Sequence, residues 1–256
     1  MSESMSIAQI ERQNAGQQAV VRTVMNLQRA GYQNASAEGV EQLTKQFKPL
    51  QDMRALLEVY NNGIDAITGD ADATDQERIA AYGELRNFIM PQYEQLAEQL
   101  AAEMTQRRQQ LHNDVFGAPE HSSPSASPAD KNTAALSYRD AVYRLQDATP
   151  EELDKAAAIA EATGDRALMR AVGVVADMRG DSEHVQRFLA HAGAKATERY
   201  EARNALPKGS TVDSLIAGFE PPRVHRGALA PSPIAMDIKR SREAQQAAGE
   251  AAMFRS

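Results

Sequence analysis

Helix start and stop signals recur along this 256-residue sequence, whereas no stretch alternates β-branched or aromatic residues with polar ones. Such an alternation is the pattern of a half-buried strand. Ala, Gln, Glu, Arg and Leu dominate instead, and these residues lose little side-chain entropy in a helix. The sequence therefore predicts an all-α fold, with an elongated N-terminal hairpin or bundle, a linker, a compact four-helix unit and an extended C-terminal arm.

Residues 1–116 are predicted to form the elongated bundle or hairpin. Apolar residues spaced three and four apart place helices over residues 6–30, 36–47, 50–67 and 75–115. Pro49 is expected to separate the second helix from the third, and Thr74 and Glu77 have the spacing of a capping box. Pro91 is expected to kink or divide the last of these helices. The first helix has a thin apolar face, so we expect it to need a partner within the chain or in another copy.

Residues 117–132 contain three Pro and four Ser but no large apolar residue, which predicts a flexible linker. Over residues 133–206 the sequence pattern changes, and short helices with clear capping residues are expected. A Gly-Asp pair at 164–165 recurs at 180–181, and each pair supplies a helix stop followed at once by a helix start. Turns this tight make neighbouring helices pack together, and a compact four-helix unit is predicted.

Residues 207–256 are predicted to form an extended tail. Its four prolines between residues 221 and 233 disfavour a helix there, and a last helix with a basic start is expected after Pro233. Short apolar pieces within the tail have the pattern of an arm that becomes ordered by docking on a partner. The candidate partner-binding residues are Phe219, Ile234, Ile238, Lys239, Arg240, Arg242 and Phe254.

The charge of the chain changes sign along its length. Residues 1–116 carry 10 Lys and Arg against 16 Asp and Glu, whereas residues 207–256 carry 7 against 5. An acidic body argues against general nucleic-acid binding, which needs clustered cations. The basic tail fits an acidic protein surface, or alternatively an ordinary solvated chain end.

No motif in the sequence names a reaction. The absence of Cys excludes disulfides and thiol chemistry, and no phosphate loop or nucleophile elbow occurs. His184 and His191 lack further ligands at zinc spacing, and the acidic stretch 70–77 lacks the Gly and Glu of a calcium loop, so both are interpreted as structural. We expect no catalytic, cofactor-binding or metal site. Neither a signal peptide nor an apolar stretch long enough to cross a membrane is visible.

Three segments resemble stretches of helical proteins encoded among the head and connector genes of tailed bacteriophages: GDRALMRA (164–171), GFEPPR (218–223) and PSPI (231–234). The acidic, helical, Gln-rich plan with a basic C-terminal helix also resembles phage scaffolding proteins. That resemblance implies a C-terminal helix that engages the capsid protein through Lys239, Arg240 and Arg242. The compact unit over 133–206 departs from the thin scaffolding rod, which leaves a minor head or portal-proximal protein open.

These patterns favour a non-enzymatic structural or assembly protein of a virion or a host cytoplasm. Its expected partners are other proteins, such as a capsid or portal protein, and further copies of itself. An alternative is an adaptor that binds proteins through residues 133–206. Nucleic-acid binding by the tail alone and an enzyme with residues assembled in space are weaker alternatives.

Overall fold

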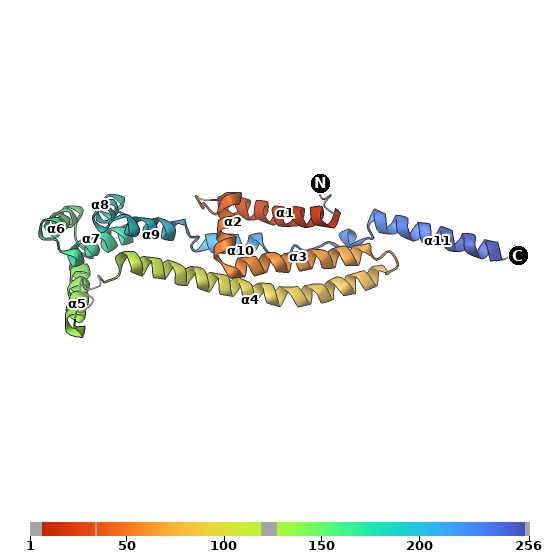
Figure 1. Ribbon diagram of the computed structural model, residues 1–256, viewed down its shortest axis with the longest axis horizontal. Helices are drawn as coiled ribbons and strands as arrows, with labels where there is room; N and C mark the ends of the chain where they lie inside the picture. The colour runs from red at the N-terminus through yellow and green to blue at the C-terminus, as the bar shows by residue number, and fades with distance from the viewer. Residues whose placement is uncertain (1–6, 34, 119–126, 254–256) are drawn as a thin grey trace, which may run out of the picture. The chain divides into compact units, whose positions relative to one another are not determined.

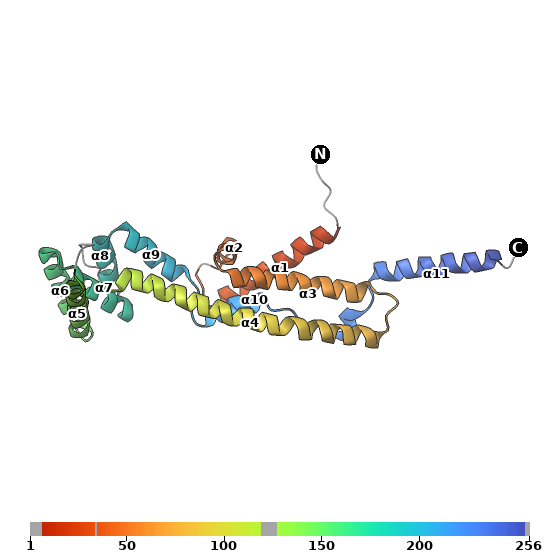
Figure 2. The ribbon, with the colours of Figure 1, turned by 60° about the horizontal axis from the view of Figure 1, so that its bottom comes forward.

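The computed structural model describes residues 7–33, 35–118 and 127–253, and every regular element within these ranges is a helix (Figures 1 and 2). The all-α prediction is confirmed. The helices are α1 (Ile7–Arg29), α2 (Ala37–Gln46), α3 (Lys48–Gly69), α4 (Asp75–Phe116), α5 (Pro128–Leu145), α6 (Pro150–Thr163), α7 (Arg166–Arg179), α8 (Ser182–Ala192), α9 (Ala194–Ala205), α10 (Ser210–Gly218), the short 3-10 helix η1 (Arg226–Leu229) and α11 (Pro233–Met253). The chain forms two compact units: unit 1 holds residues 1–103 and 207–256, and unit 2 holds residues 104–206.

Local sequence signals explain the first helix boundaries of unit 1. After α1 the chain turns at Gly31, whose φ of +75° is a left-handed conformation that favours glycine. The Ser36 side chain caps α2 by accepting a hydrogen bond from the Gly39 amide at 3.0 Å. Phe47 is extended and ends α2, and Pro49 lies in the first turn of α3, where its missing N–H costs nothing.

Helices α3 and α4 form a hairpin in unit 1 (Figure 1). The predicted capping box starts α4: the Glu77 carboxylate accepts from the Thr74 amide at 2.6 Å, and the Thr74 hydroxyl accepts from the Glu77 amide at 3.3 Å. Pro91 does not divide α4, which continues through it as one helix. Packing explains this, because Ile89 and Tyr93 are buried on either side of Pro91 and hold both turns in place.

The tail is not the extended arm that the sequence predicts. Residues 207–256 belong to unit 1, and α10 packs along α1. Leu215, Phe219 and Leu229 are all buried there. The prolines do not prevent packing, and these three apolar residues dock on helices of the N-terminal part of the same chain.

The predicted boundary at residues 117–132 also differs from the structure. Unit 2 begins at Met104, inside α4, and α5 begins at Pro128, inside the predicted linker. The end of α4 belongs to unit 2 because Val115 and Phe116 are part of its buried core, together with apolar residues of α5–α8.

Unit 2 has the predicted caps but one helix more than predicted between residues 128 and 206. Gly164 and Gly180 adopt φ of +69° and +73°, and the side chains of Asp165 and Asp181 accept hydrogen bonds from the first amides of α7 and α8. A further glycine, Gly193, adopts φ of +89° and separates α8 from α9. The predicted four helices are therefore five.

Candidate interaction surface

Hydrogen bonds to backbone carbonyls of the tail hold it to the N-terminal helices of unit 1. The Tyr93 hydroxyl donates to the carbonyl oxygen of Ile216 at 3.1 Å. The Arg22 guanidinium donates to the carbonyl of Gly218 at 2.7 and 2.9 Å and to that of Glu220 at 2.9 Å. Burial lowers the pKa of Arg22 and raises that of Tyr93. The contacts therefore come from α1 and α4, two helices that lie more than 100 positions away in the sequence.

A pair of tyrosines continues this attachment past the prolines. The Tyr60 hydroxyl of α3 donates to the carbonyl of Pro222 at 2.5 Å, and the Tyr82 hydroxyl of α4 accepts from the Val224 amide at 3.0 Å. Burial, and next to it the hydrogen bond with Tyr82, raises the pKa of Tyr60 far above its ordinary value. Tyr60 therefore stays protonated at neutral pH, and the two side chains fix the irregular segment between α10 and η1.

The start of α11 is anchored to the end of α3 and to the loop that follows it. The Ser232 amide donates to the carbonyl of Thr68 at 2.8 Å, and Ala235 is buried. The Lys239 ammonium donates to the carbonyl of Ala71 at 3.1 Å and lies 3.2 Å from the Asp72 carboxylate. The first two turns of α11 are thus part of unit 1.

Two of the predicted partner-binding residues already have contacts within the chain, and a third is not described by the structure. Phe219 is only 1% exposed and belongs to the core of unit 1. Lys239 already binds Asp72 and the loop that precedes α4. Phe254 lies outside the described residues. The apolar character of Phe219 serves docking within the chain, which the sequence pattern alone could not distinguish from docking on a partner.

The other four predicted residues form an exposed surface on α11. Ile234 and Ile238 are 69% and 49% exposed, and Arg242 follows at the same spacing of four, so all three share one helix face. Arg240 makes only an exposed ion pair within α11, at 3.7 Å. Every residue from 240 to 246 is exposed. We call Ile234, Ile238 and Arg242 the α11 face.

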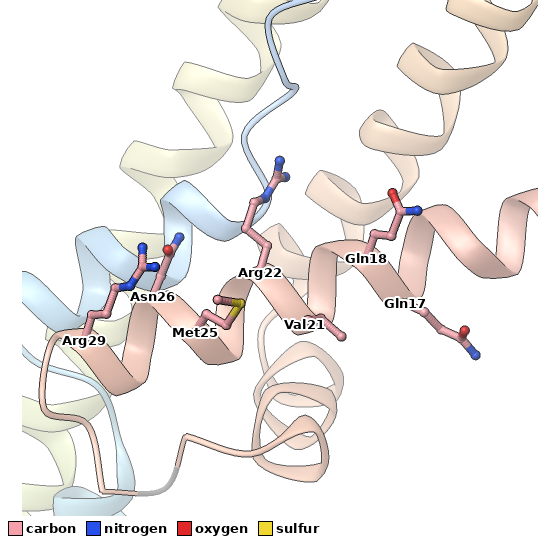
Figure 3. A pocket seen from close by; sticks show the side chains of 7 residues that line it. All are labelled: Gln17, Gln18, Val21, Arg22, Met25, Asn26 and Arg29. Carbon is pink, nitrogen blue, oxygen red and sulfur yellow. The ribbon is translucent and has the colours of Figure 1, made fainter.

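A second exposed surface lies on α1 and was missed by sequence reasoning. Val21 and Met25 are 59% and 47% exposed, although their neighbours Thr23 and Leu27 are fully buried on the opposite side of the helix. Figure 3 shows Val21 and Met25 among polar side chains of the same helix. With Gln17, Gln18, Arg22, Asn26 and Arg29 they line a hollow of about 470 Å³. The i, i+4 spacing of Val21 and Met25 could have predicted this second apolar face, but the neighbouring Gln residues made it hard to recognise in the sequence.

His184 and the acidic residues singled out from the sequence have structural partners. His184 is buried, with its Nδ1 2.7 Å from the Asp181 carboxylate and its Nε2 3.3 Å from that of Asp154. His191 is exposed. In the loop before α4, Asp70 accepts hydrogen bonds from the amides of Asp72 and Ala73 at 3.0 and 3.1 Å. Over the described ranges, the structure brings together no group of three or more His, Asp or Glu side chains that could hold a metal.

No helix in the described part of the chain is both long enough and apolar enough to cross a lipid bilayer. No protein-family model, curated protein or solved structure matches this chain.

Proposed function

We propose that this chain is a non-enzymatic structural protein that acts by binding other proteins, with α11 as its docking element. The observation that carries the proposal is the α11 face, on which two exposed isoleucines precede an arginine at helical spacing. A helix with apolar anchors beside a cation fits a hydrophobic groove with an acidic rim. Its anchored first turns support this role, because they fix the direction of the helix before a partner binds.

The outer face of α1 supports the second part of the proposal, which is self-association. Val21 and Met25 lie beside amide side chains, and such side chains hydrogen-bond readily to a neighbouring helix. Large apolar side chains on an exposed helix face lower the free energy of the chain when another surface covers them. We therefore propose that copies of this chain associate through the α1 face.

The finer proposal is a role in head assembly of a tailed bacteriophage, with the capsid or portal protein as the partner of α11. It rests on the resemblance of the three segments described above and on the basic residues at the start of α11. In the structure Arg240 and Arg242 are exposed on this helix. An acidic groove on a capsid or portal protein is the complementary surface.

The test measures binding of the full chain to the major capsid protein and the portal protein encoded in the same genome. Removing α11 by ending the chain at residue 232 keeps α10 and η1 in place, whereas ending it at residue 206 would also remove the buried Leu215 and Phe219. We expect the 1–232 chain to fold and to lose binding. The point variant Ile234→Asp/Ile238→Asp is expected to do the same.

Ile159→Asp is the matched control, since Ile159 is 55% exposed on α6 in unit 2. Binding that survives removal of α11 but is lost in Ile159→Asp would refute docking through α11 and favour the adaptor alternative. A genome with no capsid or portal gene near the gene for this chain would refute the phage role.

A further inference from the structure

The inward face of α5 explains why the helix is in unit 2, and no described residue of that unit covers its outward face. Tyr138, Ala141, Val142 and Leu145 pack into the core beside α7. On the opposite side, Leu136 and Tyr143 are 61% and 71% exposed. These two side chains are seven residues apart, or two helical turns, and so they lie on one face.

Two opposite charges lie between these apolar side chains. Arg139 and Asp140 are both exposed and occupy the positions midway between Leu136 and Tyr143. The order along the face is therefore apolar, cation, anion, apolar. Asp140 also makes an exposed ion pair with Arg144 at 2.7 Å, which contributes little stability because water screens it.

We propose that this outward face of α5, which we call the α5 face, binds the α5 face of a second copy in antiparallel orientation. A two-fold axis that passes between positions 139 and 140 brings each apolar residue onto its counterpart, Leu136 against Tyr143 of the partner subunit. The same axis places Arg139 against Asp140 of the partner subunit. Every contact is made twice, as a two-fold interface requires.

The charge order selects this orientation over a parallel one. In a parallel pair, each Arg139 would face the same arginine and each Asp140 the same aspartate. Like charges held together at an interface oppose association, whereas the antiparallel pair joins opposite charges twice. A second copy is thus the partner that matches the pattern without any change of sequence.

The size of the contact sets its strength. The part of α5 from Asn132 to Leu145, which carries the α5 face, has a length of about 20 Å at 1.5 Å per residue. A single helix pair of this length buries less area than the roughly 1,200 Å² of a stable interface, so the dimer is weak and forms at high local concentration. An assembly that holds several copies together supplies that concentration. The α5 contact does not depend on docking through α11, and the two are tested separately.

The first experiment measures self-association of the full chain by sedimentation velocity from about 1 to 200 µM. It is repeated with Val21→Asp/Met25→Asp, which removes the α1 face. In the chain without the α1 face, we expect a concentration-dependent dimer. In that same background, Leu136→Asp/Tyr143→Asp should weaken the dimer by at least about 10-fold, whereas Ile159→Asp on α6 should leave it unchanged.

Charge exchange tests the pairing itself. Arg139→Asp places two carboxylates opposite each other at both contacts and should weaken the dimer, and Asp140→Arg does the same with two cations. The double variant Arg139→Asp/Asp140→Arg restores opposite charges across the axis and should recover association. Circular dichroism of each variant verifies that α5 is still folded.

Orientation is read from disulfide cross-linking, since the chain contains no Cys. Chains with Leu136→Cys and chains with Tyr143→Cys should cross-link to each other when mixed and not among themselves, because the axis places position 136 against position 143 of the other copy. A chain that stays monomeric at 200 µM would overturn the proposal, because a second copy would then not be the partner of the α5 face. With the α1 face removed, it would also be overturned by a dimer that survives Leu136→Asp/Tyr143→Asp, by a charge exchange without recovery, or by cross-links between identical cysteine chains.

Discussion

Gly218 is the residue on which the packing of the tail depends most directly. A Cβ atom at this position would lie 1.9 Å from Oγ1, 2.6 Å from Cβ and 2.7 Å from Cα of Thr23. Ordinary contacts of this kind begin near 3.4 Å, so Gly218→Ala requires α10 to move away from α1 by about 1 Å. The close approach of two backbones, and not a special φ value, is what requires glycine here.

The cost follows from what α10 loses when it moves. Leu215 and Phe219 are buried with it, and full burial of such a side chain contributes about 1.5–3 kcal/mol. The hydrogen bonds from Arg22 to the Gly218 carbonyl weaken as well. Against this, Ala favours a helix over Gly by up to about 1 kcal/mol. If about half of the burial is lost, the net destabilisation of unit 1 is about 3 kcal/mol, or about 6–12 °C in its melting temperature.

Thermal unfolding followed by circular dichroism measures this shift, and hydrogen exchange of α1 and α10 localises it. Gly83→Ala is the matched control, because a Cβ at that position in α4 meets no atom within 4 Å. Adding Thr23→Ala should not rescue Gly218→Ala, since the clashes with Cβ and Cα of residue 23 remain. A Gly218→Ala chain as stable as the Gly83→Ala chain, or a full rescue by Thr23→Ala, would refute this account of how the tail is attached.

Three further changes test the cores and the tail attachment. Gly173→Ala places a Cβ 2.4 Å from Cγ of Phe188 and should destabilise unit 2 by about 1–3 kcal/mol in urea unfolding. Burial, and then the nearby Arg203 cation, lowers the pKa of His112 below its ordinary 6.5. The stability that unit 2 gains from a neutral His112 should be complete above pH 6.5 and should be lost as the pH falls through the pKa of the folded state. The unfolding free energy of His112→Asn should therefore depend less on pH between pH 7 and pH 5. Tyr60→Phe removes the hydrogen bond to the Pro222 carbonyl and should cost about 1–2 kcal/mol, with faster proteolysis between α10 and η1; unchanged cleavage would contradict the attachment.

Several helix boundaries were predictable because the signals that set them are local. Ser36, Thr74, Asp165 and Asp181 each satisfy an amide that lies two or three residues further along the chain. Gly164 provides the left-handed turn that the preceding helix needs to stop. Such interactions involve only neighbours in sequence, so a residue type at the right spacing is enough to infer them.

The place of the tail was not predictable for the converse reason. Arg22, Tyr60 and Tyr93 bind backbone carbonyls of residues 216–222. Every residue has such a carbonyl, so the sequence does not show which ones are bound. The apolar anchors of the tail were visible in the sequence, but their pattern is the same whether they dock on a partner or on the chain itself. Gly218 was a signal in the sequence, because glycine is the residue that allows a close approach of two backbones.

This mode of attachment separates two roles within the tail. Between residues 216 and 224, side chains of α1, α3 and α4 bind the backbone of the tail, whereas Gly218 and Phe219 are fixed by packing. On α11, Ile234, Ile238 and the side chains of residues 240–246 are exposed, and the proposed role of the helix rests on them. The tail thus fixes the start of α11 through backbone hydrogen bonds and packed residues, and α11 presents the side chains proposed to bind a partner.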